Sequence, residues 1–219
     1  MNIEQSVEQH YSVDNLQDTI LGAIEKSGKD LKSIGGVDLA PVDEFHIRGR
    51  EATHELADLV ELPPSAKVLD IGSGLGGTAR LLATEYGCQV TGVDLTRAYC
   101  EVATGLSVHL GLGTKTSFQQ GSALDLSVES GSFDVVWTEH VQMNIENKLV
   151  FYTEAARALK PGGKLVFHDA LERNKKHGPP AVGLHLLLGP TGKEKFMNVL
   201  QSLKESRVVV IQAVLTKSA

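Results

Sequence analysis

The chain has 219 residues, of which 42% are hydrophobic and 22% are charged. This length is enough to bury an α/β core and too short for two large domains, so we expect a single domain. The net charge of −6 comes without any run of lysine or arginine. Nothing would therefore neutralise the phosphates of nucleic acid or of an anionic membrane, and we expect a small-molecule partner instead.

The cysteines and the N-terminal residues predict a cytoplasmic protein. Cys88 and Cys100 form no CxxC pair and lie at no metal-ligand spacing, so we expect reduced thiols and no metal site. The first residues carry acids where a signal peptide would carry lysines. Outside the expected core strands, the longest apolar stretch is 181–189, which is too short to span a membrane.

The N-terminal part predicts a helical cap over residues 1–62, placed ahead of a core over 63–219 in the same domain. Apolar residues at helical spacing predict a first helix over 13–26, which ends at Ser27-Gly28. Residues 34–49 are rich in Gly, Asp and Pro and are interpreted as a loop. A second helix is predicted from Arg50 to Glu61, before Pro63-Pro64.

From Lys67 onward, short apolar runs alternate with amphipathic segments. This alternation predicts an α/β fold with a mostly parallel sheet, right-handed crossovers and helices on both faces. After Asp169 the pattern loosens, and two strand-like segments, 181–189 and 207–215, flank a predicted helix at 193–204 and could close the sheet. Ligands of such sheets bind at the carboxyl ends of the strands, near the point where the strand order reverses.

A glycine-rich loop, VLDIGSGLGG at residues 68–77, joins the first core strand to the first core helix. Gly72, Gly74 and Gly77 match the spacing of a dinucleotide-binding loop, which alone is a weak signal. Asp70 decides against a dinucleotide, because its carboxylate would repel the phosphates. S-adenosylmethionine (SAM) has no phosphate and carries two cationic groups, so Asp70 and the loop favour SAM, with contacts from Gly72, Ser73, Gly74 and Gly76.

Two further strand ends complete the expected cofactor site. Asp94, followed by Leu95, ends the strand after the glycine loop, where an acid accepts hydrogen bonds from both hydroxyls of an adenosine ribose. The alternative for Asp94 is a cap of the helix that starts near Thr96. Ser122, Ala123 and Leu124 follow the third strand, where adenine would lie, and an ordinary polar loop is the alternative.

With these residues in view, the chain resembles class I SAM-dependent methyltransferases, which have a Rossmann-like fold. VLDIGSGLGG, VTGVDL, GSFDVVWTEHV and LKPGGKLVFHD are similar to four of their motifs, in the family's order, over residues 66–169. HIRGREATHELADL and VWTEHVQMNI look most similar to the sarcosine/dimethylglycine and phosphoethanolamine N-methyltransferase-like branch, whose members methylate small amines.

The resemblance implies two further cofactor contacts. The chain also differs from the family's pattern in two places. The resemblance places Tyr11 over the cofactor and Arg50 near the methionine carboxylate. Ser122 stands where many relatives carry an acid for the adenine amino group. The stretch after the fifth strand is shorter than in relatives, so we expect part of the substrate lid to be missing or to be supplied by a partner subunit; a homodimer is left open.

The end of the fourth strand, Thr138-Glu139-His140, is the best-placed polar cluster for catalysis. An amine must be neutral when it attacks the methyl group, so a general base is useful, and His140 is the candidate. Glu139 would orient His140 or hold a cationic group. His46, with Arg48 and Arg50, could bind a substrate carboxylate or phosphate. The alternatives are a packed loop histidine for His140 and a solvated helix face for the arginines.

The sequence leaves three competing functions open. An NAD-linked oxidoreductase is opposed by Asp70 and by the lack of a Tyr-x-x-x-Lys pair. A non-catalytic SAM-binding partner subunit would explain the short C-terminal region. A C- or O-methyltransferase of a quinone- or lipid-like acceptor would share the cofactor half of the fold and differ only in the acceptor half.

Overall fold

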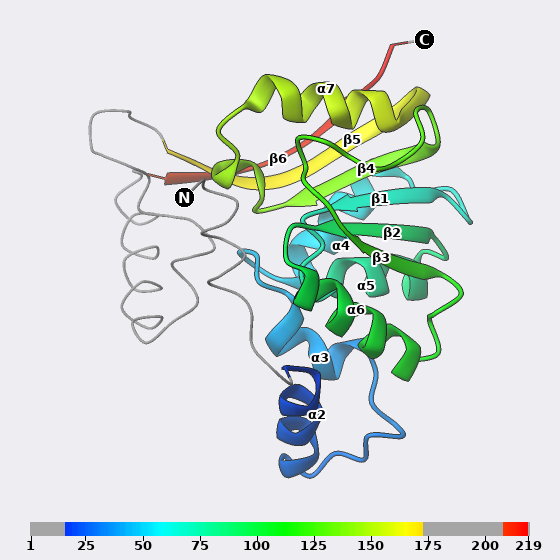
Figure 1. Ribbon diagram of the computed structural model, residues 1–219, viewed down its shortest axis with the longest axis vertical. Coiled ribbons are helices and arrows are strands. Elements are labelled where there is room, and N and C mark those ends of the chain that lie inside the picture. The colour runs from blue at the N-terminus through cyan, green and yellow to red at the C-terminus, as the bar shows by residue number, and fades with distance from the viewer. Residues whose placement is uncertain (1–15, 173–207, 219) are drawn as a thin grey trace.

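The computed structural model describes residues 16–172 and 208–218, which fold around one six-stranded sheet (Figure 1). The strands lie in the order β3-β2-β1-β4-β5-β6. The neighbours from β3 to β5 pair in parallel, and β6 pairs antiparallel with β5. The predicted mostly parallel sheet is therefore confirmed. Its strands are β1 (Lys67–Ile71), β2 (Gln89–Asp94), β3 (Thr116–Gln120), β4 (Phe133–Glu139), β5 (Leu159–Glu172) and β6 (Val208–Thr216).

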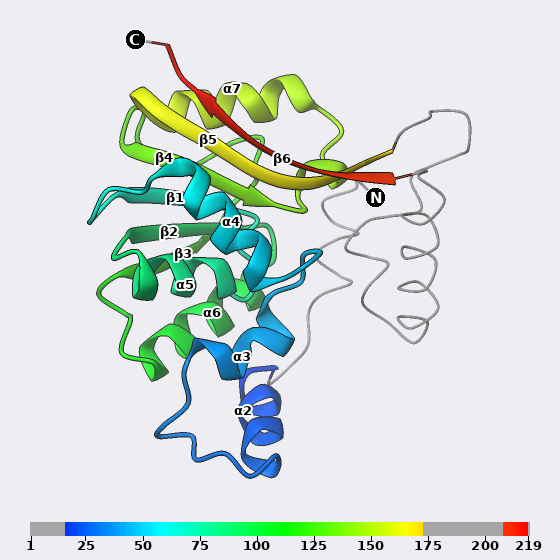
Figure 2. The ribbon, with the colours of Figure 1, turned by 180° about the vertical axis from the view of Figure 1, so that it is seen from behind.

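Helices cover both faces of the sheet, as the alternation of elements predicts (Figures 1 and 2). Along β1, Val68 packs toward α4 (Arg50–Val60) and α5 (Gly77–Glu85), whereas Leu69 packs toward α7 (Lys148–Ala158). Trp137 is fully buried in the first of these clusters. The helix α6 (Arg97–His109) runs beside β2 and β3.

The N-terminal helices α2 (Leu16–Lys26) and α4 agree with the predicted helices, but the loop predicted for 34–49 is wrong. A helix, α3 (Gly36–Asp43), lies inside it, with Pro41 in its interior. The Asp38 carboxylate accepts a hydrogen bond from the Gly35 amide at 2.7 Å and so caps the helix start. Leu39 is completely buried against α6, and this burial stabilises a helix whose glycines and proline resemble loop signals.

The three N-terminal helices pack against different parts of the core. The helix α2 packs on α6, whereas α4 lies directly against the sheet, in contact with β5, β6 and α5. The division at residues 62 and 63 stays a prediction. Cys88 and Cys100 are both free and buried.

Several predicted features lie outside the described residues. They are Tyr11, the strand-like segment 181–189 and the helix at 193–204. The strand predicted at 207–215 is confirmed as β6. Within 16–172 and 208–218, no helix is both long and apolar enough to cross a membrane.

Candidate active site

The strand order reverses between β1 and β4, and the predicted acids collect at the carboxyl ends of the strands around this point. Asp70 comes from β1, Asp94 from β2 and Glu139 from β4. The carboxylates of Glu139 and Asp94 lie close enough to Asp70 to raise its pKa. The structure thus brings together three acids that lie in separate motifs of the sequence.

The glycine loop takes a conformation that only glycine adopts without strain. Gly72 has a φ of 77°, and a Cβ there would overlap the Val141 side chain. Gly74 has a φ of 51°, and a Cβ there would meet no atom within 4 Å, so the loop has an open side at this residue. Gly76 is the left-handed N-cap of α5, and the Ser73 hydroxyl is buried without a hydrogen-bond partner among the described residues.

Asp94 binds both the glycine loop and the residue before α6. One carboxylate oxygen accepts from the Gly74 amide at 2.8 Å, and the other accepts from the Thr96 amide at 2.9 Å, where α6 starts. The N-cap residue of α6 is Thr96, so Asp94 binds the residue at the helix start without being its cap. The Thr96 side chain also hydrogen-bonds the Asp94 carboxylate. Acceptance of the ribose hydroxyls by Asp94 stays a prediction.

The predicted adenine segment lies beside Asp94. The Gly121 amide donates to the Asp94 carbonyl at 2.9 Å, and the Leu95 carbonyl accepts from the Gln120 side chain at 3.1 Å. The Ser122 hydroxyl accepts from the Leu124 amide at 3.1 Å, which makes a tight turn that includes Ala123. The ends of β2 and β3 thus form one continuous edge of the site.

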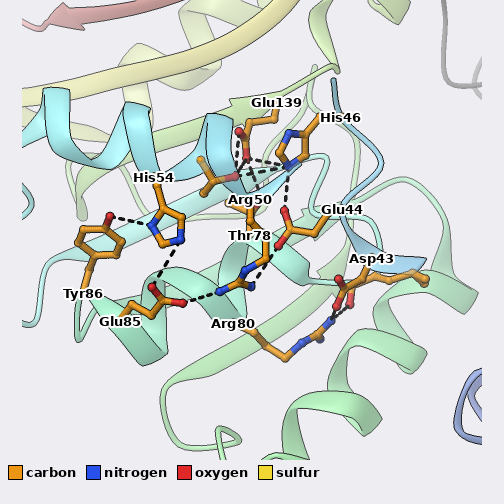
Figure 3. Close-up of polar contacts among 12 residues, drawn as sticks. Asp43, Glu44, His46, Arg50, His54, Thr78, Arg80, Glu85, Tyr86 and Glu139 are labelled. Carbon is orange, nitrogen blue, oxygen red and sulfur yellow. Dashed lines mark hydrogen bonds and ion pairs between the residues drawn. The ribbon is translucent and has the colours of Figure 1, made fainter. Parts of the chain in front are cut away.

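The Glu139 carboxylate joins three elements in a buried polar cluster (Figure 3). It accepts from the Thr78 hydroxyl of α5 at 2.7 Å and from the Thr53 hydroxyl of α4 at 3.2 Å. The Nε2 atom of His46 lies 3.6 Å from it. Thr53 and Thr78 were not predicted as site residues.

The His46 ring is buried and pairs with carboxylates through one nitrogen. Its Nε2 atom lies 3.1 Å from Glu44, and the His46 and Glu44 side chains are 7% and 3% exposed. Burial alone would lower the pKa of His46, but the carboxylates of Glu139 and Glu44 outweigh it and raise this pKa overall. His46 therefore belongs to the buried cluster around Glu139. Its binding of a substrate carboxylate or phosphate stays a prediction.

His140 and His168 hold one peptide group of the segment before α4. The Ile47 amide donates to Nε2 of His140 at 3.4 Å, and Nε2 of His168 donates to the Ile47 carbonyl at 3.0 Å. Burial is the main reason that the pKa of His140 falls to about 3 and that of His168 to about 4. Both rings are therefore neutral at neutral pH. The role of His140 as a base stays a prediction.

The two predicted substrate-binding arginines are engaged by acids. Arg50 contacts Glu44 at 3.3 Å and also pairs with Glu85 (Figure 3). Arg48 pairs with Glu51 and Glu55 near the surface, in agreement with the solvated-face alternative. The contact of Arg50 with the methionine carboxylate stays a prediction.

A buried ion pair connects α3 to the glycine loop. The Arg80 guanidinium of α5 pairs with Asp43, and it donates to the Leu75 carbonyl at 2.7 Å and to the Ser107 hydroxyl at 3.3 Å. Arg80 is 1% exposed and Asp43 is 7% exposed. The cap and the cofactor loop are thus coupled through a pair that the sequence did not reveal.

Comparison with known proteins identifies the family of the domain that carries this site. Residues 69–167 match the family described as "Methyltransferase domain". The chain is 35% identical over 72% of its length to a 2-methyl-6-phytyl-1,4-hydroquinone methyltransferase of Synechocystis and covers 50% of that protein. It is 31% identical over 69% of its length to a glycine/sarcosine/dimethylglycine N-methyltransferase of Actinopolyspora halophila and covers 27% of it.

A solved structure agrees with these matches. The fold superposes with a TM-score of 0.55 and 26% identity on phosphoethanolamine N-methyltransferase 2 of Haemonchus contortus in complex with SAM, over 72% of this chain and 35% of that one. Residues 69–167 form a class I SAM-dependent methyltransferase domain. The chain spans half the length or less of the curated relatives compared.

The residues of this methyltransferase domain fit SAM. Asp70 is 3% exposed, and one of its carboxylate oxygens has no hydrogen-bond partner within the described parts of the chain. Burial and the carboxylates of Glu139 and Asp94 raise the pKa of Asp70 well above its ordinary value. Such a surplus of buried negative charge favours a cationic ligand, and the sulfonium and ammonium of SAM supply one.

We expect SAM binding to the methyltransferase domain to release a proton and to weaken as the pH falls. A cation beside Asp70 favours the charged carboxylate, so it lowers a pKa that is raised without ligand. Affinity should be full above the ligand-free pKa and should fall as the pH drops through it. Calorimetry in buffers of different ionisation enthalpy measures the released proton. An Asp70→Asn variant with the same proton release would contradict this assignment.

Proposed function

We propose that the chain is a SAM-dependent methyltransferase that methylates the nitrogen of a small amine. The observation that carries the proposal is the convergence of Glu139 with His46, His140 and His168 at the carboxyl ends of β4 and β5. Carboxylates stabilise an ammonium group, and imidazoles accept its proton. An apolar pocket would instead favour a quinone or a lipid.

When bound, SAM supplies an activated methyl group on a cationic sulfur. The chain has to hold the cofactor, align the amine and exclude water. Asp94 and the glycine loop would hold the ribose, Ser122 to Leu124 the adenine, and Asp70 the cationic end. Glu139 is already held by Thr53 and Thr78, so its carboxylate is fixed in place to face either the cofactor ammonium or the amine.

A hydroquinone-like acceptor is the second candidate, since the Synechocystis relative carries that name. Transfer to a hydroquinone would need a large apolar acceptor pocket. The polar cluster around Glu139 argues for the amine, and direct assay separates the two. The cytoplasmic location and a homodimer stay predictions from the sequence.

Two measurements test the proposal. Calorimetry with SAM, S-adenosylhomocysteine and NAD should show binding of the first two and none of NAD. Transfer of radioactive methyl from SAM should then be found with an amine from the set of sarcosine, dimethylglycine and phosphoethanolamine. Transfer only to 2-methyl-6-phytyl-1,4-hydroquinone would establish the second candidate. SAM binding without transfer to any of these would favour a non-catalytic SAM-binding subunit.

A further inference from the structure

We propose that His46, which lies between α3 and α4, is the catalytic base that takes the proton from the acceptor amine, with Glu44 orienting its ring. The proposal rests on the N-methyltransferase function proposed above. It assigns the base to the cap rather than to the end of β4, where the sequence places it.

The contacts of His46 determine which nitrogen of the neutral ring carries the hydrogen. Glu44 at 3.1 Å, Thr53 at 3.4 Å and Glu139 at 3.6 Å all lie near the same nitrogen, Nε2 (Figure 3). Two carboxylates there require Nε2 to carry hydrogen. The other nitrogen, Nδ1, is buried and has no hydrogen-bond partner in the described parts of the chain. A neutral His46 therefore has its free lone pair on Nδ1, which is the arrangement of an oriented general base.

The other two histidines are less suited to take a proton. The lone pair of His140 already accepts the Ile47 amide, and the pKa of His140 is about 3. His168 has a buried Nδ1 atom without a partner among the described residues, but its pKa is about 4. An imidazole with so low a pKa is a weak base toward an ammonium ion. Among the three rings, only His46 has a raised pKa.

The charges around His46 couple its protonation to the cofactor. Glu44 faces it from the same loop, Glu139 from β4 and Asp70 from β1. The neutral rings of His140 and His168 lie 6.4 and 6.0 Å from it, centre to centre. Arg50 of α4 pairs with Glu44 at 3.3 Å. Without cofactor these acids raise the pKa of His46. A cationic cofactor beside Glu139 would offset the strongest of these attractions, so bound SAM should lower the pKa of His46 and favour the neutral imidazole, which is the active form of the base.

The proton balance is simple. Nδ1 of neutral His46 accepts one proton from the acceptor ammonium, and the imidazolium so formed is stabilised by Glu44. The freed amine lone pair forms the new N–C bond, while the electron pair of the S–C bond stays on sulfur. His46 returns its proton to solvent after the products leave, so each turnover releases one proton.

The first test needs no acceptor. Nuclear magnetic resonance of imidazole-labelled protein measures the pKa of His46, assigned by its absence in His46→Asn. We expect a value above 6.5 without ligand and a drop of about one unit or more when SAM saturates the protein. A pKa that SAM leaves unchanged would overturn the proposal, whatever the outcome of the acceptor screen.

The second test is kinetic, with the amine that the wild type methylates. His46→Asn should lower kcat by about 10²–10⁴-fold, leave SAM affinity nearly intact, and regain activity with added imidazole. His46→Gln is the second variant should the first not fold. His109→Gln is the matched control, because His109 lies on α6 and, within the described parts of the chain, its ring bonds the Leu31 carbonyl rather than a site residue. Normal kcat in both His46 variants, with the base ionisation lost in His140→Asn, would assign the base to His140 instead.

Discussion

Replacing Arg80 with methionine is expected to lower the free energy of unfolding by about 3–5 kcal/mol, which is the effect of removing one partner from a buried ion pair. The substitution leaves the Asp43 carboxyl, in a residue that is 7% exposed, without the guanidinium that pairs with it. It also removes the donors that bind the Leu75 carbonyl and the Ser107 hydroxyl. Urea denaturation followed by circular dichroism measures the change.

A surface pair provides the control for this substitution. Arg97 pairs with Glu101 on α6, and their side chains are 75% and 65% exposed. Arg97→Met should therefore change the free energy of unfolding by less than about 1 kcal/mol. A double variant, Arg80→Met with Asp43→Leu, should recover part of the loss because no charge stays buried. Equal effects at Arg80 and Arg97 would show that the buried pair has no special role.

Asp94→Ala is expected to weaken SAM binding by about 10²-fold or more, because hydrogen bonds to a charged acceptor contribute about 1.5–3 kcal/mol each. The carboxylate would accept both ribose hydroxyls, and it also holds the Gly74 amide of the glycine loop at 2.8 Å. Its loss therefore removes direct contacts and loosens the loop. Calorimetry with SAM measures the change in affinity.

Two controls separate binding from folding at Asp94. Asp18→Ala removes an exposed acid from α2, outside the site, and should leave SAM affinity unchanged. Thermal unfolding of Asp94→Ala without ligand shows whether losing the bonds to Gly74 and Thr96 disturbs the core. A folded Asp94→Ala protein with wild-type affinity would remove Asp94 from the ribose site.

The sequence could predict the sheet because its signals are local. Apolar runs mark β1, β4 and β5, and the glycines mark the turn into α5, whereas β3 (TSFQQ) is mostly polar. The helix α3 could not be recognised in the same way, since its composition resembles a loop. What stabilises α3 is the burial of Leu39 in the cluster with α6, a contact between segments far apart in the chain.

In the candidate site too, the residues marked by local sequence signals could be predicted. The contacts between segments far apart in the chain could not. Parallel strands end at one edge of the sheet, so Asp70, Asp94 and Glu139 could be expected together. The contact of Thr53 with Glu139 joins residues 86 positions apart, and no spacing rule reports it. Glu44 offered a weak signal, as an acid two residues before His46. The neutral state of His140 follows from its burial, which only the folded structure reveals.

The hydrogen bonds of the Ile47 peptide group report whether the N-terminal cap is docked on the sheet. The Ile47 amide donates to a histidine from the end of β4, and the Ile47 carbonyl accepts from a histidine of β5. Because the attachment uses main-chain atoms, it is independent of the side chain at position 47, although a proline there would remove the donor. Deuterium exchange at this one amide therefore follows the docking of the cap without any label, and it does so separately from the occupancy of the cofactor site.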